Sequence, residues 1–207
     1  MESFADMGNY ITYFGMIFGI ILIAVSVFAS LFSSRILLDE EKGKSIEFLA
    51  AREVNRTEIY LAKYITAFIA VLLVVCFSSV VALICGLIGG GDTFDFIEYV
   101  RIIKISSITP FFFLTLSISL AGASFKFGNA MVSGLILMSS YMLGYLSKLL
   151  GENGEWLKYF STFELFSSSK VVELERETIV WYGVYFIISV ILVVVGGYFY
   201  NKRDYKI

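Results

Sequence analysis

Charged residues are absent from five long windows of this chain, and this pattern limits its fold more than any other feature. Each window has at least 21 residues, and the windows cover 7–34, 64–91, 105–125, 127–147 and 178–201. About 20 apolar residues in a helix cross a hydrocarbon layer ~30 Å thick. Lipid offers the backbone no hydrogen bonds, and windows this long do not alternate as barrel strands do. The sequence therefore predicts an all-α, polytopic integral membrane helix bundle with five transmembrane helices.

Composition supports a single membrane domain over residues 1–207. Hydrophobic residues make up 58% of the chain, more than a soluble core of this size would hide. Between the expected spans we predict a cytoplasmic loop at 35–63 and an outer amphipathic loop at 148–178. The expected spans cover about 10–33, 64–89, 105–125, 128–148 and 179–200.

Basic residues predict the orientation. With the N-terminus outside, ten of the 16 Lys and Arg residues fall in cytoplasmic segments, and 11 of the 18 acidic residues fall outside. Lys and Arg are enriched in the cytoplasmic loops of membrane proteins. We therefore expect an N-out, C-in topology.

The outer loop is unusually apolar for a solvated segment. It contains six acidic residues and seven large apolar ones, which suit short amphipathic pieces lying on the outer interface. An ordinary solvated loop is the alternative. The seven are Trp156, Leu157, Tyr159, Phe160, Phe163, Leu165 and Phe166.

The residue types argue against an enzyme. The chain has no His, and the serines within the windows have no Lys, Asp or His beside them in the membrane to activate them. Small hydroxyl residues more often pack membrane helices together, and Gly15-x-x-x-Gly19 and Gly86-x-x-x-Gly90 have the spacing for close helix approach. We predict no catalytic, cofactor-binding or metal-binding residue. No ionisable residue interrupts a window, which also disfavours a gradient-driven transporter or channel.

One short motif imitates a nucleotide-binding loop. Gly43-Lys44-Ser45 matches the end of the GxxxxGK[ST] pattern, but Leu38 stands where the first glycine belongs and no strand precedes it. We interpret the match as coincidence, so ATP would have to be bound by another subunit.

The cytoplasmic loop mixes apolar residues with charges. Ile46, Phe48 and Leu49 lie among charged residues, and Asn55-x-x-Glu58 has the form of a helix N-cap that starts the next helix near Arg56. The pattern fits a charged amphipathic helix that receives a push from a soluble partner. A solvated connector fits the same physics equally well.

The residues from Glu40 to Ile59, followed by Lys63, resemble the signature loop of type-2 (ABC-2) ABC transporter permeases. Lys44 to Leu49 match closely, as do Val54, Arg56 and Lys63, and the tail Tyr200-Asn201-Lys202-Arg203-Asp204 is similar to the family's usual ending. Glu53 and Asn55 depart from the pattern, because the family has proline and serine there. The family also has six spans, so the resemblance implies that its first helix is absent here, through a shortened permease or a late start codon.

The resemblance implies an exporter permease subunit of a prokaryotic plasma membrane. It pairs with a second permease copy or homologue, sits in the lipid bilayer, binds no nucleic acid and docks a cytoplasmic ABC ATPase that binds the ATP. A non-transporting membrane scaffold or assembly protein is the alternative. The implied ATPase-coupling residues are Glu41, Lys44, Ser45, Glu47, Phe48, Leu49, Arg52, Arg56 and Lys63.

Overall fold

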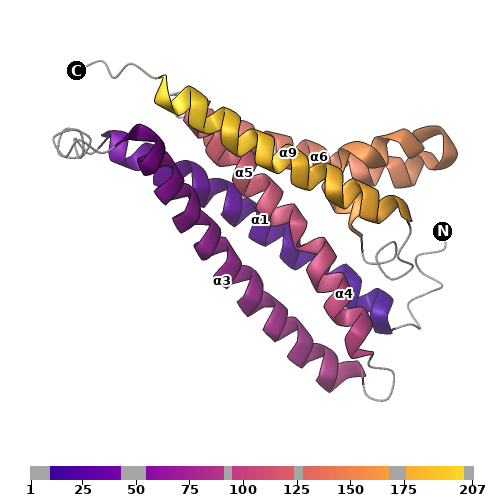
Figure 1. The fold of residues 1–207 in the computed structure, drawn as a ribbon. Coiled ribbons are helices and arrows are strands. Elements are labelled where there is room, and N and C mark those ends of the chain that lie inside the picture. The colour runs from indigo at the N-terminus through magenta and orange to yellow at the C-terminus, as the bar shows by residue number, and fades with distance from the viewer. Residues whose placement is uncertain (1–9, 43–54, 91–94, 124–127, 168–175, 203–207) are drawn as a thin grey trace.

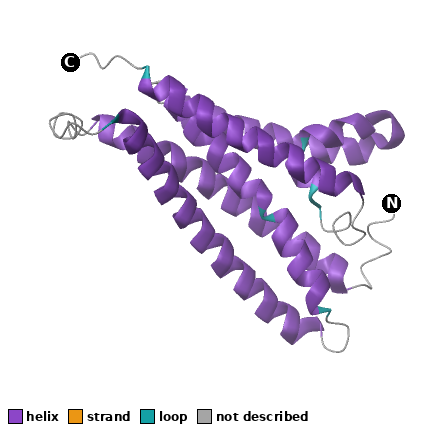
Figure 2. Cartoon of the chain, viewed as in Figure 1, coloured by secondary structure: helices purple, strands orange, loops and turns teal. Residues whose placement is uncertain are grey.

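Every element of the computed structural model is helical within the residues it describes, 10–42, 55–90, 95–123, 128–167 and 176–202 (Figure 2). The predicted all-α class is confirmed for this part of the chain. The elements are α1 (Tyr10–Lys42), α3 (Arg56–Gly90), α4 (Phe96–Ser106), α5 (Ile108–Ala123), α6 (Gly128–Leu150), the 3-10 helix η3 (Gly151–Phe160), α7 (Thr162–Leu165) and α9 (Arg176–Asn201).

Four helical segments among the described residues are long and apolar enough to cross a membrane: Ile17–Leu38, Arg56–Ile88, Phe96–Ala123 and Arg176–Asn201. They overlap the first, second, third and fifth predicted spans. Helix α6 coincides with the fourth, 128–148, but it is not among these four segments. The count of five and the orientation therefore stay predictions.

Helix α5 is the centre of the bundle. It contacts α1, α3, α6 and α9, and most of its side chains are buried, including Phe113, Leu114 and Ile118. Helices α3 and α9 meet at one end and diverge toward the other (Figure 1). Their outer faces expose many large apolar side chains, as expected of surfaces that contact lipid or another membrane helix.

The third predicted span, 105–125, is part of a longer element, Phe96–Ala123, which has one interruption. Helix α4 starts earlier, at Phe96, where the Asp95 side chain accepts a hydrogen bond from the Ile97 amide at 2.9 Å. A single turn residue, Ser107, separates α4 from α5, and its φ of −64° and ψ of −13° stay in the right-handed helical region. Pro110 explains the break, because it has no N–H to donate to the Ser106 carbonyl four residues earlier.

The segment expected to be a loop at 35–63 is largely taken up by its flanking helices. Helix α1 continues to Lys42, beyond the predicted end of the first span at 33, and α3 begins at Arg56, where the Asn55 signal places it. The Asn55 carbonyl accepts from the Glu58 amide at 2.9 Å, and its side-chain amide donates to the Glu58 carboxylate at 3.3 Å. Residues 43–54 lie outside the described part of the chain.

The apolar segment after α6 forms short helices that return onto the bundle. Leu157, Leu165 and Phe166 are buried, and Phe163 lies against the rings of Phe113 and Tyr141. Of the seven apolar residues in this segment, Trp156 and Phe160 are the most exposed. Most of the apolar surface thus packs against other helices, while its location at the outer interface stays a prediction.

Candidate functional site

The predicted coupling residues fall in two groups. Six of these residues lie outside the described part of the chain: Lys44, Ser45, Glu47, Phe48, Leu49 and Arg52. For Glu41, the structure describes only its place in the last turn of α1. Arg56 and Lys63 are described. Arg56 is the first residue of α3, and Lys63 lies two turns further along the same helix. We refer to the end of the bundle that holds the C-terminus of α1, the N-terminus of α3 and the C-terminus of α9 as the 43–54 end.

Lys63 ties the two helices that flank residues 43–54. Its ammonium donates a hydrogen bond to the backbone carbonyl of Ile36 in α1 at 3.0 Å, and the residue is only 8% exposed. A hydrogen bond from a charged donor contributes about 1.5–3 kcal/mol. The start of α3 is therefore held against α1.

Tyr60 ties the start of α3 to α9. The residue is 1% exposed, and its ring lies 5.6 Å from the ring of Tyr200 near the end of α9. The sequence analysis did not identify Tyr60. Its spacing of one turn from Tyr64 on a helix with an apolar core-facing stripe is the signal that would have pointed to a packed position.

Two glycines allow α5 and α9 to approach closely beside Tyr60. A Cβ atom added at Gly122 would lie 2.8 Å from the Gly196 carbonyl oxygen, and one added at Gly196 would lie 2.7 Å from the Ser119 Cα. Neither glycine belongs to the pairs that the sequence singled out. At Gly19, from the first pair, no atom lies within 4 Å of an added Cβ. The close helix approach is thus made by glycines far apart in the sequence.

Three serines from different helices form a buried cluster in the bundle. The Ser30 hydroxyl of α1 donates to Ser133 of α6 at 2.8 Å, and the Ser117 hydroxyl of α5 donates to the Ser30 carbonyl at 2.5 Å. The hydroxyls of Ser117 and Ser133 are 3.0 Å apart. Ser119 adds a hydrogen bond from α5 to the Leu192 carbonyl of α9 at 2.6 Å. These contacts confirm that buried hydroxyls pack the helices together.

The described residues contain no group of three or more His, Cys, Asp or Glu that could hold a metal ion. In the serine cluster, the hydroxyls of Ser30, Ser117 and Ser133 bond to one another and to the Ser30 carbonyl. These hydrogen bonds hold α1, α5 and α6 in register.

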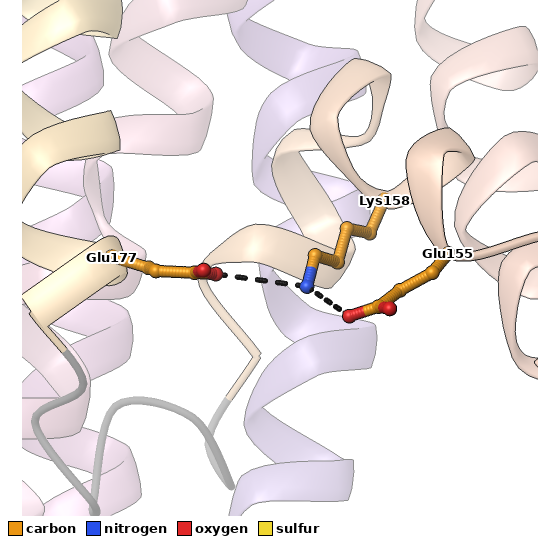
Figure 3. A network of polar contacts seen from close by, with 3 residues as sticks. All are labelled: Glu155, Lys158 and Glu177. Carbon is orange, nitrogen blue, oxygen red and sulfur yellow. Dashed lines mark hydrogen bonds and ion pairs between the residues drawn. The ribbon is translucent and has the colours of Figure 1, made fainter. Parts of the chain in front are cut away.

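At the opposite end of the bundle, ion pairs fasten η3 and α7 to the helices beside them. Lys158 in η3 lies 2.5 Å from the Glu155 carboxylate and 3.6 Å from that of Glu177 at the start of α9 (Figure 3). The hydrogen bond to Glu155 raises the pKa of Lys158, so the ammonium stays charged at neutral pH. Lys148 of α6 pairs with Glu164 of α7 at 2.9 Å. These ion pairs add to the buried apolar contacts of Leu165 and Phe166 at this end.

Residues 2–201 match the family model described as the multidrug efflux system permease Rv1217c, C-terminal domain. The chain belongs to this family. Neither the curated proteins nor the solved structures gave a significant match.

Membership in the efflux-permease family agrees with a membrane protein that transports rather than catalyses. The matched region contains every described helix in full, since α1 begins at Tyr10 and α9 ends at Asn201. It therefore includes both sides of the 43–54 end, with Lys63 on α3 and Tyr200 on α9. Membership in this family implies a partner such as an ATPase or a second permease, so the surfaces of this chain that contact a partner are important for its function.

Proposed function

We propose that this chain is the permease subunit of an ABC exporter of the ABC-2 type, and that a separate cytoplasmic ATPase docks on the 43–54 end. ATP binds to the ATPase subunit, and the helix bundle moves the substrate outward. The observation that carries the proposal is the hydrogen bond from Lys63 to the Ile36 carbonyl, because it joins the helices on both sides of the segment that resembles the family's signature loop.

This junction suits the transfer of force from a soluble partner. A helix transmits displacement along its axis because its backbone is fixed by internal hydrogen bonds. A push on residues 43–54 would reach α1 and α3 together through Lys63, and α9 through Tyr60. Helix α5, which contacts α1, α3 and α9, would then receive the movement from three sides.

The remaining parts of the proposal follow from the same assignment. Helix α6 is the fourth membrane span in chain order and brings the number of spans to five, and the N-out, C-in topology puts the 43–54 end in the cytoplasm of a prokaryotic cell. The exposed apolar faces of α3 and α9 contact lipid and a second permease copy or homologue. The family description, a multidrug efflux system permease, supports outward transport.

Co-purification with the ATPase tests the coupling assignment. Two variants, Glu47→Lys and Leu49→Asp, each change the charge of the proposed docking surface. At a partner contact, such a change leaves a charge desolvated and unpaired, which costs about 2–5 kcal/mol of binding. We therefore expect normal amounts of permease in the membrane and at least a roughly 30-fold weaker association with the ATPase.

The matched control is Asn153→Lys, which changes the charge at an exposed position on the opposite end of the bundle. This variant should retain the ATPase in full. Full retention of the ATPase and of transport by both Glu47→Lys and Leu49→Asp would mean that 43–54 is a connector, and would favour the scaffold function.

A further inference from the structure

The Tyr60 side chain places a polar group where no described residue accepts its hydrogen bond. It is 1% exposed, and its hydroxyl has no hydrogen-bond partner among the residues that the structure describes. A buried hydroxyl without a partner is costly, since it has given up its hydrogen bonds to water. The conformation described here therefore carries a penalty that a modest rearrangement would remove.

Acceptors lie close to this hydroxyl, at the crossing of α5 and α9. A Cβ atom added at Gly196 would lie 2.5 Å from the Tyr60 hydroxyl oxygen and 2.7 Å from the Ser119 Oγ, so the two hydroxyls flank the same glycine. The Ser119 hydroxyl donates its proton to the Leu192 carbonyl and keeps lone pairs that accept. A small shift of α3 against α5 and α9 would bring Tyr60 and an acceptor together.

We propose that the Tyr60 hydroxyl is a state-dependent hydrogen-bond donor, unpartnered in the conformation described here and bonded to the α5–α9 crossing in a second conformation. The proposal rests on the proposed function, because a permease that is driven through a cycle must have at least two conformations. Tyr60 is thus a positioning residue that acts through the crossing and does not touch the substrate.

The position of Tyr60 near the start of α3 lets this hydrogen bond respond to movement of the helix. The residue lies about one turn from Arg56, where α3 begins, and one turn from Lys63, which holds α3 to α1. Movement that enters at the 43–54 end therefore reaches Tyr60 before it reaches the rest of α3. Gaining the hydrogen bond there would favour the displaced position of α3, and losing it would favour the return.

Tyr60→Phe tests the proposal because it removes the hydroxyl and keeps the ring. The full chain, with Cys76 and Cys85 replaced by alanine, is spin-labelled at Ile88 and Ile179, two exposed positions near the diverging ends of α3 and α9. Distance distributions are measured by double electron–electron resonance in lipid nanodiscs, and thermal stability is measured on the same samples. The matched control is Tyr64→Phe, which removes a hydroxyl one turn further along α3.

We expect Tyr60→Phe to shift the ratio of the two populations about threefold to tenfold toward the conformation described here. This fold-change corresponds to the net free energy of one hydrogen bond. Its melting temperature should equal or exceed that of the unsubstituted chain, and Tyr64→Phe should change neither. A distribution unchanged by Tyr60→Phe, a lower melting temperature, or an equal shift in Tyr64→Phe would overturn the proposal. Neither measurement involves the ATPase, so the docking of the ATPase and the role of Tyr60 can fail separately.

Discussion

Gly196→Ala is the substitution that most sharply tests how this bundle is held together. The added Cβ would lie 2.5 Å from the Tyr60 hydroxyl oxygen and 2.7 Å from both the Cα and the Oγ of Ser119. Tyr60 can turn aside, but the Cα belongs to the backbone of α5. Helices α5 and α9 must therefore move apart, which breaks the hydrogen bond from Ser119 to the Leu192 carbonyl.

The expected loss of stability follows from these contacts. Overpacking a well-packed site costs about 1–3 kcal/mol. The broken interhelical hydrogen bond adds about 0.6 kcal/mol, and the better helix propensity of alanine returns up to about 1 kcal/mol. We expect a net destabilisation of about 2 kcal/mol, which lowers the melting temperature by about 4–8 °C for a chain of this size.

Gly183→Ala is the control on the same helix, because no atom lies within 4 Å of a Cβ added there. The assay is thermal melting of the purified protein, followed as the fraction that stays monodisperse in size-exclusion chromatography. Gly183→Ala should melt at the same temperature as the unsubstituted chain or higher. Equal melting temperatures for Gly196→Ala and Gly183→Ala would refute the close approach of α5 and α9. Adding Tyr60→Phe to Gly196→Ala should restore only part of the stability, since the steric overlap of the added Cβ with the Ser119 Cα remains.

Two further predictions concern packing and topology. Ser117→Ala should lose about 1–2 kcal/mol of stability, because the Ser117 hydroxyl bonds to both α1 and α6. The Ser139 hydroxyl bonds only to its own helix, so Ser139→Ala should lose less than about 0.5 kcal/mol. Equal melting temperatures for the two variants would contradict the interhelical role of Ser117. In intact cells, an impermeant thiol reagent should label a cysteine at Asn153 and spare cysteines at Ser45 and Lys206, and the reverse pattern would overturn the orientation.

The helices themselves were predictable because their causes are local. In lipid, the backbone of an uncharged window of at least 20 residues satisfies its hydrogen bonds by forming a helix. The all-α class therefore followed from residue types alone. The start of α3 at Arg56 was equally local, since the Asn55 carbonyl accepts from the amides of Glu58 and Ile59 and the two side chains of Asn55 and Glu58 bond to each other. The break at Ser107 follows from Pro110, although the sequence analysis placed the start of that span nine residues too late.

The contacts between helices were not predictable in the same way, because they join residues far apart in the sequence. Gly122 and Gly196 meet only once α5 and α9 cross, and neither lies in a GxxxG pattern that would have singled it out. In the sequence, nothing distinguishes three of the serines from other small hydroxyl residues, and only the packing of α1, α5 and α6 brings Ser30, Ser117 and Ser133 together. Lys63 was identified through the family resemblance, but its partner, the Ile36 carbonyl, is a backbone atom that no side-chain pattern indicates.

Photo-cross-linking from Leu49 tests the central claim most directly. A photoreactive amino acid at Leu49 is activated in native membranes, and the adduct is identified by mass spectrometry, with Asn153 as the matched position on the opposite end. The account predicts an adduct between Leu49 and a subunit that carries Walker nucleotide-binding motifs, and no such adduct from Asn153. If Leu49 captures no ATPase, or if Asn153 captures it equally well, the 43–54 end is not the coupling site.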